Sequence, residues 1–98
     1  MNTPEVAQIL SAIGQPTRLD ILRFVAPYSR GDTADGVAAG DISRWLGMPP
    51  ATVSFHLKDM TYKGLLTQER RGRSIHYKAD LDALVKALDY LVSEVCGG

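Results

Sequence analysis

Apolar residues recur at helical spacing near both ends of this 98-residue chain. At the start, Thr3 and Pro4 suit the cap and the first position of a helix, and the apolar positions that follow predict a helix over residues 3–13. At the end, Asp80 is a suitable N-cap for a helix over residues 80–95. The apolar stripe of that helix comprises Leu81, Leu84, Val85, Leu88, Leu91, Val92 and Val95.

A second helix is predicted to follow the first after a short break. Pro16 fits its first turn, and Pro27 stops it. Residues 28–40 are rich in Gly, Asp and Ser, which is typical of a surface loop. We therefore expect this segment to be a plain connection, although its composition leaves open a ligand contact.

Two helices separated by a tight turn are predicted in the middle of the chain. The first covers about residues 40–46 and is expected to end at Gly47, which can adopt a left-handed conformation. Its expected buried face comprises Ile42, Trp45 and Leu46. The next helix runs from Pro50 to about Lys63, and its core-facing positions are Val53, Leu57 and Met60.

A short hairpin is predicted directly after these helices. Residues 65–70 and 74–78 have strand character, and Arg71, Gly72 and Arg73 lie between them as the tip. A helix, a tight turn, a second helix and a basic hairpin together indicate a winged helix-turn-helix, which inserts one helix into the DNA major groove. The expected fold class is thus mainly α with a small β-hairpin, in a single domain over residues 1–98.

The charge distribution is consistent with DNA binding although the net charge is zero. Residues 44–78 carry seven basic and two acidic side chains, whereas residues 1–43 carry three and five, and residues 79–98 carry one and four. The middle segment is therefore +5, between flanks of −2 and −3. Attraction to phosphate depends on local charge, so this pattern suits an oriented DNA-binding face, while an ordinary solvated surface remains the alternative.

Two motifs resemble the ArsR/SmtB family of winged-helix repressors. Residues 13–22 read Ile-Gly-Gln-Pro-Thr-Arg-Leu-Asp-Ile-Leu, and residues 46–60 read Leu-Gly-Met-Pro-Pro-Ala-Thr-Val-Ser-Phe-His-Leu-Lys-Asp-Met. The resemblance implies a homodimer in which helices 3–13 and 80–95 pack across a two-fold axis. It also implies a repressor that binds double-stranded DNA at a palindromic operator. Pro49 departs from the family pattern, in which a serine at this position usually caps the helix that enters the DNA groove. We call this helix, predicted here from Pro50 to about Lys63, the reading helix.

Candidate DNA contacts lie on the reading helix and on the wing. On the helix they are Thr52, Ser54, Phe55, His56 and Lys58, where hydroxyls reach bases or phosphates and an aromatic ring can contact a thymine methyl. For His56, a structural role on the helix flank is an equal alternative. On the wing the candidates are Arg70, Arg71 and Arg73. The expected dimer interface comprises Val6, Ile9, Leu84, Leu88, Leu91, Val92 and Val95.

The metal-site motifs of the family do not identify the effector, which is the molecule that would make the repressor release DNA. The third helix lacks the Cys-x-Cys pair of the arsenic, cadmium and lead type, and no histidine follows His76 for the zinc type. We expect neither a metal site nor a cofactor. Cys96 is a candidate thiol sensor, through an intersubunit disulfide or a shared soft-metal site, although an inert terminal cysteine is the preferred interpretation. The partner that would release DNA is thus an unknown small molecule or redox agent.

Two alternatives to the operator-binding repressor remain. One is a repressor that responds to oxidants or arsenicals through Cys96, and the other is a winged-helix module that docks an acidic protein. The sequence shows no nucleophile–base pair and no phosphate-cradling loop, so we do not expect an enzyme. Neither a signal peptide nor a membrane span is expected, and the predicted location is cytoplasmic.

Overall fold

The computed structural model describes residues 1–31 and 34–97, so residues 32 and 33 of the predicted loop lie outside the described part. Five α-helices and a small sheet form one elongated body, with extents of 45 × 28 × 19 Å. The helices are α1 (Thr3–Ile13), α2 (Pro16–Val25), α3 (Ala39–Leu46), α4 (Pro50–Tyr62) and α5 (Leu81–Tyr90). The strands are β1 (Val37–Ala38), β2 (Leu66–Arg71) and β3 (Ser74–Ala79). A 3-10 turn over Ala26–Tyr28 extends α2, and a π-helical turn over Leu91–Val95 extends α5.

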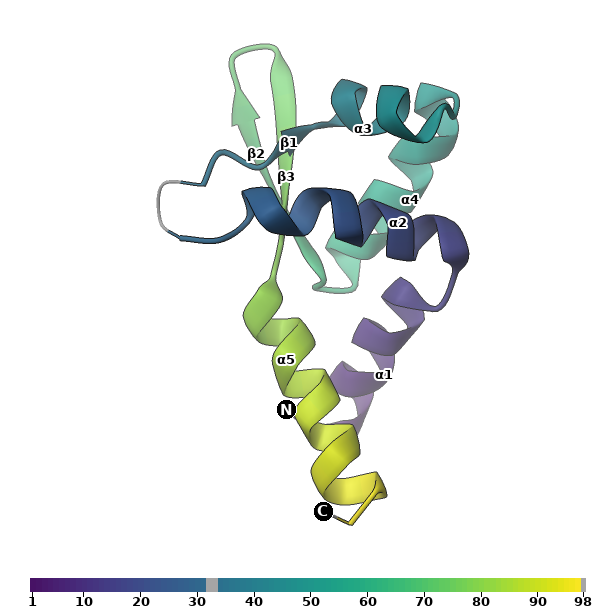
Figure 1. Cartoon of the computed structure of the whole chain (residues 1–98), viewed down its shortest axis with the longest axis vertical. Helices are drawn as coiled ribbons and strands as arrows, with labels where there is room; N and C mark the ends of the chain where they lie inside the picture. The colour runs from purple at the N-terminus through teal and green to yellow at the C-terminus, as the bar shows by residue number, and fades with distance from the viewer. Residues whose placement is uncertain (32–33, 98) are drawn as a thin grey trace.

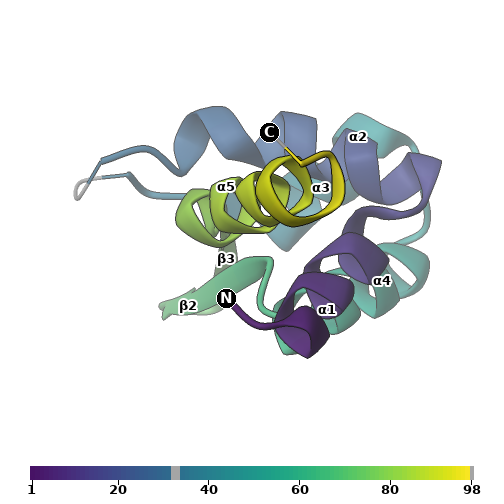
Figure 2. The same ribbon diagram turned by 90° about the horizontal axis from the view of Figure 1, so that it is seen from below.

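Different secondary-structure elements lie at the two ends of the long axis (Figure 1). One end holds α1, α5 and both chain termini, and the other holds α3, the start of α4 and the tip of the β2–β3 hairpin. Seen from below, α5 and α1 lie next to each other beneath the rest of the molecule (Figure 2). The fold therefore separates its terminal helices from its helix-turn-helix and wing.

Helix boundaries follow the predicted local signals closely. Helix α1 begins at Thr3, but the cap is Asn2, whose side chain accepts from the Glu5 amide while Glu5 reaches back to the Asn2 amide. Asp80 caps α5 as predicted, because its carboxylate accepts from the amide of Ala83 at 3.0 Å. Helix α3 ends at Gly47, whose φ of +67° confirms the left-handed stop.

The sheet is larger than the predicted hairpin by one short strand. Strand β1 pairs antiparallel with β3, with Val37 opposite Tyr77 and Ala38 opposite His76, and the strand order is β1-β3-β2. Gly36 makes this pairing possible, because its φ is +68° and a Cβ there would approach the carbonyl oxygen of Tyr77 to 2.6 Å. The predicted loop over residues 28–40 therefore contains β1 and the start of α3.

The core lies where the helices meet the root of the hairpin. Val53, Leu57 and Met60 of α4 are buried, as predicted, and they join Ile21, Ile42, Leu65 and Leu66 among the core side chains. The expected burial of Trp45 is wrong, since its side chain remains 52 % exposed. The two-turn helix α3 buries Ile42 and Ser43 instead, and the indole of Trp45 stacks on Phe24 at a centroid distance of 4.5 Å.

Helix α1 packs against α5 of the same chain. Val6 and Ile9, which were expected at the dimer interface, are only 3 % exposed within a single protomer and belong to its core. The expectation that they form an intersubunit surface is therefore corrected. Helical periodicity identified their buried face, but α4 and α5 of the same chain already cover it.

Candidate nucleic-acid interface

The turn between α3 and α4 is held by side-chain and backbone hydrogen bonds. The buried hydroxyl of Ser43 donates to the carbonyl oxygen of Met48 at 2.6 Å. The amide of Met48 in turn donates to the carbonyl oxygen of Ser43 at 3.2 Å. Pro49 occupies the cap position of α4 without a side-chain hydrogen bond, as its departure from the family pattern predicted. These contacts fix the angle at which α4 leaves α3.

The outward face of α4 carries most of the predicted helix contacts. Thr52, Phe55 and Lys58 are exposed, and the ring of Phe55 is 66 % accessible. Ser54 and His56 are half-buried and lie on the flanks of this face. Tyr62, seven positions after Phe55, continues the face and is 84 % exposed. Tyr62 is not among the predicted helix contacts, although its i, i+7 spacing from Phe55 indicates the same face.

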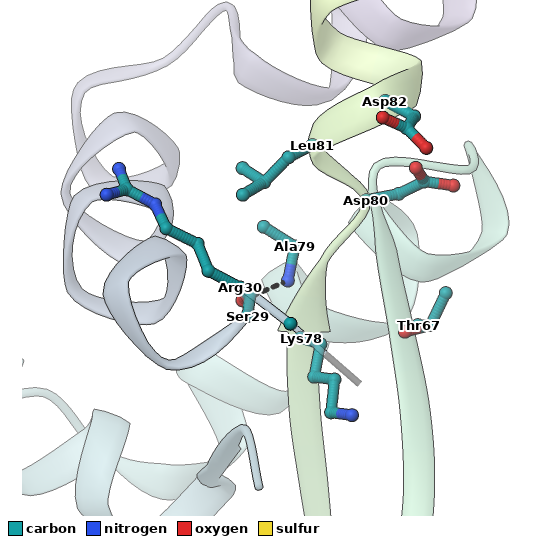
Figure 3. A pocket seen from close by; sticks show the side chains of 9 residues that line it. Ser29, Arg30, Thr67, Lys78, Ala79, Asp80, Leu81 and Asp82 are labelled. Carbon is teal, nitrogen blue, oxygen red and sulfur yellow. Dashed lines mark hydrogen bonds between the residues drawn. The ribbon is translucent and has the colours of Figure 1, made fainter. Parts of the chain in front are cut away.

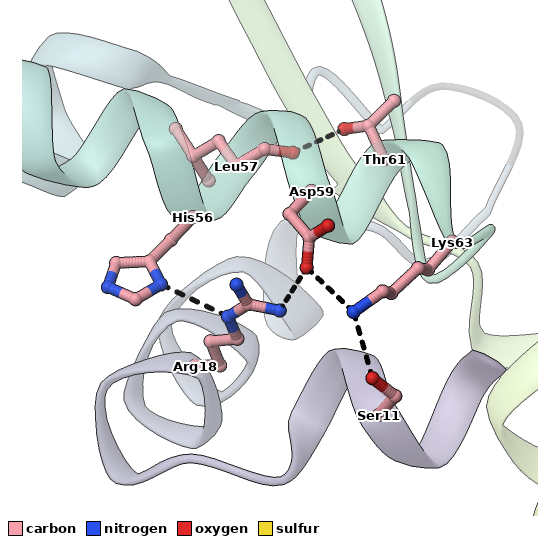
Figure 4. A network of polar contacts seen from close by, with 7 residues as sticks. All are labelled: Ser11, Arg18, His56, Leu57, Asp59, Thr61 and Lys63. Carbon is pink, nitrogen blue, oxygen red and sulfur yellow. Dashed lines mark hydrogen bonds and ion pairs between the residues drawn. The ribbon is translucent and has the colours of Figure 1, made fainter. Parts of the chain in front are cut away.

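His56 belongs to a polar network that joins three helices (Figure 4). The guanidinium of Arg18 in α2 donates from Nε to His56 Nδ1 at 3.0 Å and from a terminal nitrogen to Asp59 Oδ2 at 2.5 Å. Lys63 contacts the same carboxylate oxygen at 2.9 Å and donates to the Ser11 hydroxyl of α1 at 2.8 Å. We call these five residues the Arg18 network. It anchors the inner flank of α4 to α1 and α2.

Arg18 lies outside the set of residues predicted to form the site. Its side chain is 8 % exposed, and it belongs to the motif over residues 13–22. A buried guanidinium must be paired, because an isolated charge in the interior is costly. An arginine on the otherwise apolar inner face of a predicted helix, three residues before Ile21, was the available signal.

The network sets the protonation of His56 and Asp59. Burial lowers the pKa of the His56 imidazole, and the positive charge of Arg18 lowers it further, while Asp59 acts in the opposite direction. Hydrogen bonds from Lys63 and Arg18 lower the pKa of the Asp59 carboxyl. Since a guanidinium only donates, Nδ1 of His56 accepts and the neutral ring carries its proton on Nε2. In Figure 4 this second nitrogen points away from Arg18, as a donor.

We expect the free energy of unfolding to fall as the pH is lowered from about 7.5 to about 5.5. The pKa of His56 in the folded protein lies below its ordinary value of 6.5, so the unfolded chain binds more protons in this range. The stabilisation is therefore present above pH 6.5 and is lost as the pH falls through the folded-state value. Urea unfolding at fixed protein concentration, at a series of pH values, measures this slope.

The matched pair for this measurement is His56→Gln and His76→Gln. The first variant removes the titrating ring of the Arg18 network and should flatten the slope. The second leaves the network intact and should keep the slope of the wild type. An unchanged slope in His56→Gln would show that His56 is not the group responsible.

The wing is a hairpin of two six-residue strands joined by a two-residue turn. Gly72 and Arg73 form the turn, and the register places Arg71 opposite Ser74 and Arg70 opposite Ile75. Arg71 pairs with Asp35 at 2.9 Å and with Glu69 at 3.3 Å, so its charge is partly neutralised and it braces the hairpin against the preceding loop. Arg70 and Arg73 are exposed and form no ion pair with the described residues. The free charge of the wing is thus concentrated at these two residues.

The apolar side chains of α5 divide into two sets. Leu84 and Leu91 are half-buried, and Leu84 packs against the protomer's own core. Val85, Leu88, Val92 and Val95 are between 46 and 69 % exposed and follow one another along a single face. We call these four residues the α5 stripe. Cys96 follows it as an exposed free thiol.

One hollow lies beside the root of the hairpin (Figure 3). It has a volume of about 510 Å³ and carries Arg30 and Lys78 against Asp80 and Asp82. The Asp80 carboxylate is already used as the α5 cap, and the neighbouring Ser29 hydroxyl accepts from the Ala79 amide at 2.7 Å. In residues 1–31 and 34–97, no three His, Cys, Asp or Glu side chains lie close enough to share a metal ion. Nor does that part of the chain contain a helix long and apolar enough to cross a membrane.

Comparison with known proteins gives one consistent picture. A family described as "Helix-turn-helix domain" matches residues 13–69. The chain is 30 % identical to the HTH-type transcriptional regulator YbzH of Bacillus subtilis, over 93 % of this chain and 99 % of that protein. It is 31 % identical to the "Putative arsenical resistance operon repressor ArsR2" of Halobacterium salinarum, over 86 % of this chain and 68 % of the relative.

A solved structure agrees with these relatives. It is the homodimeric winged helix-turn-helix DNA-binding domain of a possible ArsR-family regulator from Mycobacterium bovis. The TM-score is 0.70 at 26 % identity, with 95 % of this chain and 79 % of that chain covered. The predicted winged helix-turn-helix fold is therefore confirmed.

Proposed function

The chain belongs to the ArsR family of winged helix-turn-helix transcriptional regulators, and from that premise we propose that it is a homodimeric repressor of a palindromic operator. Membership of the family confirms the resemblance seen in the two sequence motifs. It also confirms that the chain is a regulator rather than an enzyme. A repressor of this kind acts on chromosomal DNA, so the proposed location is the cytoplasm.

One observation carries the proposal. The start of α4 and the tip of the wing lie at one end of the long axis, while α5, which carries the α5 stripe, lies toward the other (Figure 1). Two copies joined through the α5 stripe would present two α4 helices and two wings toward the same duplex, which is the arrangement that a palindrome requires. The homodimeric state of the Mycobacterium bovis domain supports this assembly.

Each residue predicted to contact DNA from α4 or the wing has a proposed role if it is not already paired. Phe55 contacts a thymine methyl, while Thr52 on the outer face of α4 and Ser54 on its flank reach bases or phosphates. Lys58 binds phosphate. Arg70 and Arg73 bind the backbone or enter the minor groove from the wing.

His56 keeps both roles that the sequence left open. Its Nδ1 accepts from Arg18, which is the structural role, while Nε2–H remains a donor for DNA. The Arg18 network therefore presents this donor in a fixed tautomer and orientation.

DNA from the region upstream of the protein's own gene tests the proposal. Fluorescence anisotropy across a salt series should show saturable binding to one short palindrome. With about six phosphates neutralised per dimer, the slope of log affinity against log salt should be about −5. Sedimentation of the same sample should give the mass of a dimer. Equal affinity for the palindrome and for random DNA would contradict the proposal.

The two alternatives give other results in the same titration. A module that docks an acidic protein would fail to bind any DNA with this salt dependence. A thiol-responsive repressor would bind when reduced and release DNA on oxidation or on addition of an arsenical. That response should disappear in Cys96→Ser, because Cys96 is the only cysteine of the chain.

Replacing Arg73 with alanine should weaken binding to all sequences alike. Each protomer loses one phosphate contact, so the salt slope of the dimer should become shallower by about two. The preference for the palindrome should not change, because phosphate contacts carry no sequence information.

Arg23→Ala is the matched control for the wing variant. It removes the same charge from a side chain of α2 that is 82 % exposed. Its salt slope should equal that of the wild type. Equal salt slopes in Arg73→Ala and Arg23→Ala would show that Arg73 does not contact DNA.

A further inference from the structure

Three aromatic side chains meet on the surface where the end of α2 and the 3-10 turn after it lie beside α3. Phe24 stacks on Trp45 with an interplanar angle of 13°, and its ring meets Tyr28 edge-on at a centroid distance of 6.2 Å. Trp45 and Tyr28 are each more than half exposed. Flat apolar surface of this kind is a common wall of small-molecule sites.

A pocket of about 410 Å³ lies beside two of these rings. Its lining is formed by Phe24, Tyr28, Gly36, Val37, Ala38, Asp41 and His76. The β1 side of the pocket is rigid, because Val37 and Ala38 pair with β3 and the amide of Gly36 donates to the carbonyl oxygen of Tyr28 at 3.1 Å. We call this hollow the aromatic pocket. A preformed pocket loses little entropy when a ligand binds.

Two side chains of the aromatic pocket, Asp41 and His76, supply hydrogen-bond acceptors. Asp41 supplies a carboxylate, and its ion-pair partner Arg44 is a neighbour on the same helix with both side chains more than half exposed. Such an exposed ion pair contributes little to stability, so a cationic ligand can take the place of Arg44 beside the carboxylate. Nδ1 of His76 lies 3.1 Å from the carbonyl oxygen of Asp35, which can only accept. The neutral ring therefore carries its proton on Nδ1 and leaves Nε2 as an acceptor.

We propose that the aromatic pocket binds a small planar organic cation. The flat part of the ligand packs against Phe24 and Tyr28, whose ring faces attract positive charge. Its N–H groups donate to the carboxylate of Asp41 and to the imidazole of His76. The site lies outside the proposed DNA-binding surface, and its test does not depend on DNA binding.

Three probes of equal shape and different charge test the proposal. Benzamidinium, benzamide and benzoate share one ring and carry charges of about +1, 0 and −1 at pH 7.5. Amide chemical shifts of the isotope-labelled protein report both affinity and location. Benzamidinium should shift the amides of residues 24–28, 36–41 and 76 with a dissociation constant on the order of a millimolar. Benzamide should bind about fivefold more weakly, and benzoate should not bind at the same concentrations.

Two pairs of variants make the test specific. Asp41→Asn should narrow the difference between the affinities of benzamidinium and benzamide, whereas Asp20→Asn should not, since Asp20 forms a similar exposed pair with Arg23 and does not belong to this lining. Tyr28→Ala should weaken benzamidinium about fivefold. Tyr62→Ala, which removes another exposed tyrosine, should leave the affinity unchanged.

Three outcomes would overturn the proposal. They are shifts confined to other residues, equal affinities of the three probes for the wild type, and an affinity in Asp41→Asn that equals that of Asp20→Asn. Saturable, charge-ranked binding that Asp41→Asn and Tyr28→Ala both weaken would establish the site.

Discussion

Replacing Arg18 with alanine should lower the free energy of unfolding by about 3 kcal/mol, which is a large part of the stability of a small domain. The substitution leaves Asp59 with Lys63 alone and leaves Nδ1 of His56 without its donor. It also removes the aliphatic stem of a side chain that is 8 % exposed. The full cost of breaking a buried pair is not expected, because the Asp59 side chain is 29 % exposed and water can replace part of the contact.

Urea unfolding at equal protomer concentration measures this loss, because the stability of a dimer depends on concentration. Arg23→Ala is again the matched control. It removes an exposed arginine of the same helix, whose nearest carboxylate oxygen is 4.0 Å away, and should cost less than about 0.5 kcal/mol. Arg18→Lys should fall between the two, since an ammonium has no planar fork to reach both His56 and Asp59. A loss in Arg18→Ala as small as that of the control would show that the network contributes little.

The double variant Leu88→Glu, Val92→Glu should be a folded monomer with at least about a hundredfold weaker affinity for the operator. Both side chains lie in the α5 stripe and are 46 and 55 % exposed in the protomer, so charges there do not disturb the core. In the proposed dimer the same charges are buried and unpaired, which opposes association strongly. Loss of the dimer separates the DNA-binding surfaces of the two protomers. The second protomer then no longer meets its half-site at a high effective concentration.

Sedimentation and the DNA titration measure the two effects together. Ser93→Glu is the control, since it adds a charge to the same helical segment at an exposed position outside the stripe. It should remain a dimer with unchanged affinity. A double variant that stayed dimeric with wild-type affinity would exclude the α5 stripe as the interface.

The helices were predictable because their signals are local. The cap at Asp80, the left-handed stop at Gly47 and the spacing of Val53, Leu57 and Met60 all lie within the elements that they define. Such signals fix the faces and ends of helices without reference to the rest of the chain. The resemblance of the two motifs then supplied the order of the elements in space.

What the sequence could not supply were contacts between distant positions. Strand β1 has two residues and depends on partners about forty positions later, so its own pattern is too short to detect. His56 and Asp59 lie 38 and 41 positions after Arg18. Periodicity likewise showed that Val6 and Ile9 are buried, but not that their own protomer buries them. For Arg71, the neutralising contact with Asp35 was invisible for the same reason.

The reach of β1 has a mechanical consequence for the wing. Within the described part of the chain, His76 and Tyr77 of β3 have a strand on both sides, so the hairpin is three-stranded at its middle and a two-stranded ribbon from Arg70 to Ile75. Two-stranded ribbons twist more strongly and resist bending less than wider sheets. The wing is therefore stiffer at its middle than at its end, so the tip can follow grooves of different width while the three-stranded part keeps a constant position.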